Sequence, residues 1–86
     1  MTPEKAEILA LEALGWLAAE PDAIGRLMEQ SGTDAPSLRQ SAGTPEMAVA
    51  VLDFLLADDA LLLRFCDHAD VTPRDIHLAR HRLGGE

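Results

Sequence analysis

Residues 44–69, TPEMAVAVLDFLLADDALLLRFCDHA, decide the fold. Wound as an α-helix, segment 47–57 is apolar around most of its circumference, and only Glu46 and Asp53 occupy the remaining strip. The next segment, 59–69, is apolar on one face and carries Arg64 and Asp67 on the opposite face. A helix that is apolar nearly all round belongs in the middle of a small domain, so we expect these two helices to form the heart of the core.

Five prolines divide the rest of the chain into helices. Proline is favoured at the first helical position, and a Thr, Asp or Asn just before it caps the helix. Caps are predicted at Thr2, Thr44 and Thr72, at either Thr33 or Asp34, and more weakly at Glu20. The predicted helices cover residues 3–19, 21–30, 35–41, 45–57, 59–69 and 73–83. No stretch shows the period-two alternation of a strand, so the sequence predicts an all-α fold, a compact single-domain bundle of five to six short helices over residues 1–86.

Apolar periodicity predicts the inner faces of the remaining helices. These faces comprise Leu9, Ala10, Ala13, Leu14, Trp16 and Leu17 in the first helix, Ile24, Leu27 and Met28 in the second, and Ile76, Ala79 and Leu83 in the last. Residues 35–41 offer only Leu38. Gly32, Gly43 and the pair Gly84 and Gly85 are the predicted helix stops.

The two halves of the chain also resemble each other. When residues 9–30 are laid over residues 47–68, Trp16 pairs with Phe54, and the same register places Leu38 on Ile76. Glu20 is likewise paired with Asp58, and Arg26 with Arg64. We call this register the internal alignment. Two alternatives explain it: a chance alignment of Ala- and Leu-rich helices, or two similar three-helix units, residues 3–41 and 45–83, each burying an apolar face of the other.

Composition and charge narrow the class of protein. The chain has 86 residues and a formal net charge of −8, and a negative field repels both phosphate backbones and anionic lipids. We therefore expect no nucleic acid and no membrane surface among its partners. A lone Cys66, no signal-type leader and no apolar run of roughly 20 residues indicate a soluble cytoplasmic protein. No motif predicts a cofactor.

The candidates for metal binding and catalysis are few. His77 and His81 stand at i and i+4 on one helix face, a spacing that suits Zn²⁺, but no intervening Glu or third ligand accompanies them. They are weak metal candidates, and two solvated histidines explain the pattern as well. Cys66 and His68 point to different helix faces, so Cys66 is predicted to be an inert core thiol.

Isolated acidic residues near the central helix have structural explanations. Asp53 is the single charge within segment 47–57, and a buried carboxylate there would be a functional signal through a raised pKa. It shares a strip with Glu46, so we expect it to be exposed. Asp58 and Asp59 are interpreted as a helix cap and a first-turn carboxylate rather than a metal-binding or acid–base pair.

Several apolar side chains fall outside the predicted inner faces. Leu78 projects between Arg74 and Arg82 on the basic last helix, and Leu63 lies off the face of its own helix, so these four residues form a possible partner surface. Ile8 and Leu11 flank the polar side of the first helix. Because a small domain cannot bury all of a 48% apolar composition, Ile8, Leu11, Leu63 and Leu78 are the expected contact points for a protein partner or a homodimer.

Finally, the sequence carries a resemblance to a known family. The runs EALGWLAAEPDAIGRLMEQSG (12–32) and AVAVLDFLLADDALLLRFCDHADVTPRDIHLARHRLGG (48–85), and above all VLDFLLADDALLLRFC (51–66), resemble a family of short alphaproteobacterial proteins that share a domain of unknown function. The resemblance implies a cytoplasmic, all-helical protein and supplies no functional residues. Two functional hypotheses follow: a non-enzymatic protein–protein interaction or regulatory module, or a metal-dependent sensor or enzyme that uses His77 and His81.

Overall fold

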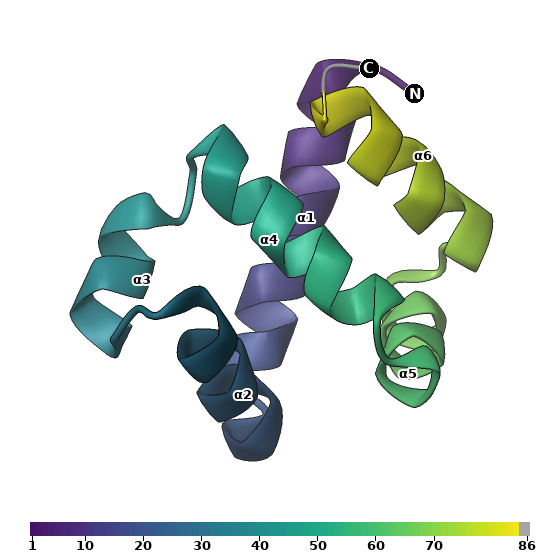
Figure 1. Ribbon diagram of the computed structural model, residues 1–86. Coiled ribbons are helices and arrows are strands. Elements are labelled where there is room, and N and C mark those ends of the chain that lie inside the picture. Colours follow the sequence, from purple (N-terminus) through teal and green to yellow (C-terminus); the bar gives the residue numbers. More distant parts are fainter. Residues whose placement is uncertain (85–86) are drawn as a thin grey trace.

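The computed structural model describes residues 1–84 and is built from α-helices (Figure 1). In chain order these are α1 (Pro3–Ala18), α2 (Pro21–Ser31), α3 (Ala35–Ser41), α4 (Pro45–Leu56), α5 (Asp59–Ala69) and α6 (Pro73–Leu83). No strand occurs among residues 1–84. The all-α class and all six predicted helices are confirmed, and each helix ends within one residue of its predicted bounds.

Side-chain caps fix five of the six helix starts. The capping oxygens, each accepting a backbone N–H of the first turn, belong to Thr2, Asp34, Thr44, Asp58 and Thr72. At α3 the cap is Asp34 rather than Thr33, with an N···O distance of 3.0 Å from the Ser37 amide. The weaker cap predicted at Glu20 is wrong: Glu20 precedes α2 but makes no side-chain capping bond, and glutamate is not among the residues preferred at this position. At α6 the cap is reciprocal, because the Thr72 amide donates to the carboxylate of Asp75.

Left-handed residues end two of the helices. Gly32 ends α2 at φ 67°, as predicted for a glycine stop. Asp70 ends α5 at φ 57°. Aspartate tolerates this conformation better than most residues do, but the sequence analysis did not predict a stop there. Gly84 follows α6 in a right-handed conformation, φ −72°. The second glycine of that predicted stop, Gly85, lies outside the described residues.

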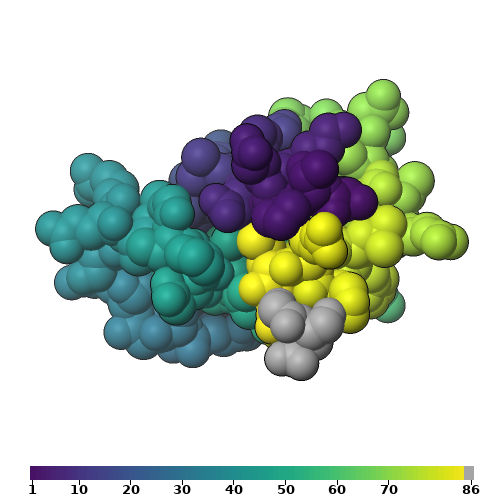
Figure 2. All heavy atoms as spheres, turned by 90° about the horizontal axis from the view of Figure 1, so that it is seen from above, coloured from purple at the N-terminus to yellow at the C-terminus, as the bar shows by residue number. Residues whose placement is uncertain are grey.

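The centre of the molecule is a stack of α1, α4 and α6. In Figure 1, α4 crosses α1, and α6 packs extensively against both. Figure 2 shows the first turns of α1 lying directly against α6. The expectation that α4 and α5 together form the heart of the core is therefore only half right. Small residues Ala6, Ala10 and Ala13 let α1 approach its neighbours closely, whereas α5, apolar on one face only, covers the core from outside.

The interior is aliphatic with few aromatic side chains. Its largest fully buried side chains are those of Leu17, Leu27, Val51, Leu52, Leu55, Phe65 and Ile76. Trp16, predicted on the inner face, is half-buried at the edge of this core. No polar or charged residue is buried within residues 1–84. Over the same residues, no helix combines the length and apolarity that crossing a bilayer requires.

The internal alignment has a structural counterpart in two matched arginines. The Arg26 guanidinium carbon lies 5.5 Å from the centre of the Phe54 ring, and that of Arg64 lies 5.5 Å from the centre of the Trp16 ring. Arg26 also pairs with Asp58, and Arg64 pairs with Glu20. The internal alignment pairs Arg26 with Arg64, Trp16 with Phe54 and Glu20 with Asp58, so it turns each arginine's set of partners into the other's. Helices α1 and α2 are thus related to α4 and α5 by a pseudo-two-fold exchange.

The third helices break this relation. α6 has 11 residues and packs between α1 and α4, whereas α3 has seven residues and makes only a small contact with α4. Among the residues of α3, only Leu38 is buried. The two predicted three-helix units therefore agree in their first two helices and differ in the third.

Candidate functional site

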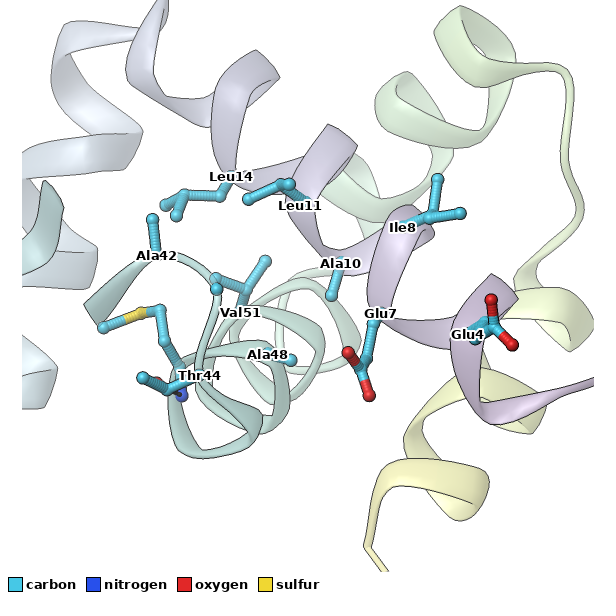
Figure 3. Close-up of a pocket in the computed structure, with 12 residues that line it drawn as sticks. Glu4, Glu7, Ile8, Ala10, Leu11, Leu14, Ala42, Thr44, Ala48 and Val51 are labelled. Atoms are coloured by element: carbon cyan, nitrogen blue, oxygen red, sulfur yellow. Dashed lines mark hydrogen bonds between the residues drawn. The ribbon is translucent and has the colours of Figure 1, made fainter. Parts of the chain in front are cut away.

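An apolar groove of about 370 Å³ lies between α1 and α4 (Figure 3). Its lining residues are Glu4, Glu7, Ile8, Ala10, Leu11 and Leu14 of α1, Ala42, Gly43 and Thr44 of the connection, and Met47, Ala48 and Val51 of α4. We call this feature the α1/α4 groove. Its volume falls in the range of ordinary ligand and segment-binding clefts.

The groove has a buried floor and an exposed apolar wall. Met47 and Val51 on α4 are 8% and 0% exposed, and Leu14 on α1 is 7% exposed. On the wall, Ile8 and Leu11 are 59% and 53% exposed. These two side chains are three positions apart on α1 and therefore stand side by side. The result is a continuous apolar surface that runs from the core into solvent.

The charged residues that line the groove are both acidic. Glu4 and Glu7 come from the first two turns of α1 (Figure 3), where the helix dipole favours carboxylates. None of the twelve lining residues is Lys, Arg or His. The groove therefore combines an apolar surface with a negative potential.

Thr44 brings the one hydroxyl group of the groove lining, and that hydroxyl is engaged. It accepts the Met47 amide at 3.2 Å and donates to the Ser41 carbonyl at 2.7 Å. A hydroxyl held in a helix cap is not poised as a nucleophile. The geometry of the α1/α4 groove therefore suits binding of an apolar group.

The predicted metal candidates lie away from the groove. His77 and His81 are exposed on α6. Across residues 1–84, no three His, Cys, Asp or Glu side chains are grouped as a metal site would require. Cys66 is buried, and burial raises the pKa of its thiol. His68 is exposed and lies beside the rings of Trp16 and Phe65. The predicted core position of Cys66 is confirmed.

The acidic residues near α4 have the structural roles that were predicted. The Asp53 side chain is 54% exposed. It accepts a 2.6 Å hydrogen bond from Arg80 Nε on α6, a partner that the sequence analysis missed. Asp58 caps α5, and its pKa is lowered first by the Leu61 amide that it accepts and then by Arg26.

The predicted partner residues divide into separate regions. Ile8 and Leu11 lie together in the α1/α4 groove. Leu63 on α5 and Leu78 on α6 are 57% and 41% exposed, and neither lines the groove. Arg74 and Arg82 are exposed on α6. The prediction that Met47 and Val51 belong to the core is confirmed, but the sequence did not show that they also form the floor of the groove.

Comparison with known proteins identifies the family. The family described as "Protein of unknown function (DUF3572)" matches residues 3–86. The chain belongs to the DUF3572 family. This match spans both segments on which the resemblance rested, residues 12–32 and 48–85. No curated protein and no solved structure matches the chain, so a function for this DUF3572 member is argued from the groove itself.

Proposed function

We propose that the protein is a non-enzymatic interaction module that binds an apolar segment of another protein in the α1/α4 groove. The observation that carries the proposal is the exposure of Ile8 and Leu11 above the buried floor of Met47 and Val51. Burying one such side chain contributes roughly 1.5–3 kcal/mol relative to leaving it in water. Two adjacent exposed side chains next to a ready apolar floor are typical of a protein-binding surface.

The net charge supports the same class of partner, and the free thiol indicates the compartment. A formal charge of −8 disfavours binding to nucleic acid or to anionic lipid, which supports a protein partner over either of these two. We infer that the site of action is the cytoplasm, since the single cysteine, Cys66, is a free buried thiol and cytosolic proteins keep their thiols reduced.

Site-specific photo-crosslinking in the protein's own cells tests the proposal. A benzophenone amino acid would replace Leu11 in the groove, and matched control chains would carry it at Leu63 or Leu78, which are exposed leucines outside the groove. We expect an adduct with one protein from position 11 that disappears when Ile8 is changed to Glu. Adducts only from the control positions, or an adduct that persists in the Ile8→Glu chain, would place the interaction elsewhere.

A further inference from the structure

The protein already contains one helix seated between α1 and α4, namely α6. It packs against both helices and buries Ile76 and Ala79 completely. Arg80 of α6 then anchors the helix from its edge, donating a 2.6 Å hydrogen bond to Asp53 of α4. An amphipathic helix with an arginine beside its apolar seam is therefore a ligand that this pair of helices accepts.

The internal alignment relates the α1/α4 groove to the seat of α6. The internal alignment carries Met47 and Val51 of the groove floor onto Leu9 and Ala13 of α1, the helix with which α6 makes its most extensive contact. The same alignment carries Asp53, the anchor of Arg80, onto Gly15. Gly15 lies one helical turn after Leu11, on the same side of α1.

The helix that would occupy the counterpart seat is α3, and it does not fill it. α3 has seven residues and only a small contact with α4. Ile8 and Leu11, on the α1 side of the groove, remain more than half exposed. The chain thus has two related seats between α1 and α4, and one of them is open.

We propose that the occupant of the α1/α4 groove is an amphipathic helix of a partner protein, built like α6. Its apolar residues would repeat at the i, i+3, i+7 spacing of Ile76, Ala79 and Leu83, with Arg or Lys flanking the seam. The groove itself carries the complementary charge, because Glu4 and Glu7 line it and no cation does. This inference rests on the proposed function and specifies its partner.

The probe is a fluorescein-labelled peptide of residues 72–84, TPRDIHLARHRLG, which carries three arginines and one aspartate. Fluorescence anisotropy with the full-length protein should show saturable binding below about 1 mM, weakened by added salt. Leu11→Glu should weaken binding about tenfold or more, because it removes a buried leucine contact and adds an acid within the seam. Leu63→Glu, an equally exposed site on α5, should leave binding unchanged. Circular dichroism would verify that both variants keep their helicity.

A variant that should bind the peptide more tightly provides a second test. Gly15→Asp places on α1 a carboxylate like the one that Asp53 provides on α4, and apart from the adjacent helix backbone no atom lies within 4 Å of the added Cβ. The variant should bind the peptide about two- to fivefold more tightly, as expected for an exposed ion pair. That gain should vanish with a peptide that carries Arg80→Gln.

Three results would overturn the inference. The first is that the peptide shows no saturable binding up to about 1 mM. The second is that Leu11→Glu leaves peptide binding intact. The third is that sedimentation equilibrium shows a dimer of the protein that Leu11→Glu dissociates. The second would mean that the peptide displaces α6 from its own seat, and the third would make a second copy of the chain the occupant. If position 11 cross-links to another protein but the peptide does not bind, the proposed function stands and the helical ligand is rejected.

Discussion

Arg26 of α2 and Asp58, the cap of α5, join the two halves of the chain. Both terminal nitrogens of the guanidinium lie 3.3 Å from one carboxylate oxygen of Asp58, while the other oxygen accepts the Leu61 amide at 3.1 Å. One side chain therefore starts a helix and holds a neighbouring helix against it. The ion pair between Glu20 and Arg64 repeats the link in the opposite direction, so each half contributes one arginine to the other.

Asp58 should give stability a dependence on pH. The Leu61 amide and Arg26 lower its pKa in the folded state, so its ionised form stabilises the protein above the ordinary carboxyl pKa of about 3.9. This contribution is lost as the pH falls through the lowered folded-state pKa. Asp58→Asn should have a lower urea midpoint than the parent at pH 7, and the difference should shrink toward zero in strong acid. Asp67→Asn, on the exposed face of α5, is the matched control and should keep a urea midpoint at pH 7 close to that of the parent.

The central helix should be intolerant of cavities. Leu52 and Leu55 are both 0% exposed, and replacing either by Ala should destabilise the fold by about 2–5 kcal/mol through lost burial and the cavity left behind. Leu63→Ala, at an exposed site, should stay within about 0.5 kcal/mol of the parent. Urea denaturation followed by circular dichroism measures all three. Equal midpoints for the three variants would contradict the central position of α4.

The threonine caps should each contribute measurably. Thr44→Ala and Thr72→Ala remove oxygens that accept first-turn amides at 3.2 Å, and each should lower the free energy of unfolding by about 1 kcal/mol. Thr33→Ala should have a smaller effect, because Asp34 caps α3. Thermal melts of the three variants test these cap assignments. A large loss of stability in Thr33→Ala alone would mean that Thr33, and not Asp34, caps α3.

Glycines should respond according to their backbone. Gly15 and Gly25 lie inside helices, and an added Cβ would meet no atom within 4 Å, so Gly→Ala at either should stabilise the protein by about 0.5–1 kcal/mol. Gly32 has the same free space but a φ of 67°. Ala there should destabilise the protein, because a Cβ is strained in the left-handed region. Differential scanning calorimetry should rank Gly32→Ala below the parent and the other two above it.

Local signals explain why the helices could be predicted so closely. A Thr followed by Pro marks a helix start, and Gly32 marks a helix end. Both signals lie in adjacent residues of the sequence, so neither needs information from distant residues. Asp70 lacked such a signal, since a left-handed aspartate is recognised only from its backbone.

Long-range relations were the part that sequence reasoning could not supply. The bond between Arg80 and Asp53 joins residues 27 positions apart, and no local pattern selects that pair. The exposed wall of the groove could be predicted from the helical positions of Ile8 and Leu11. Its floor could not, because that depends on how α1 and α4 pack against each other. The internal alignment had paired Arg26 with Arg64, but it predicted neither of the contacts that these arginines make.

The position of α6 also bears on how the protein is made. The helix that packs between α1 and α4 follows the other five in the chain and leaves the ribosome after them, so the central stack cannot close before α6 has emerged. Until α6 is released, part of the apolar surface of α1 and α4 is unprotected, and such nascent surfaces are prone to aggregate or to be held by chaperones. A premature stop before Pro73 would keep five helices and still leave the core open, because α6 supplies the fully buried Ile76 and Ala79.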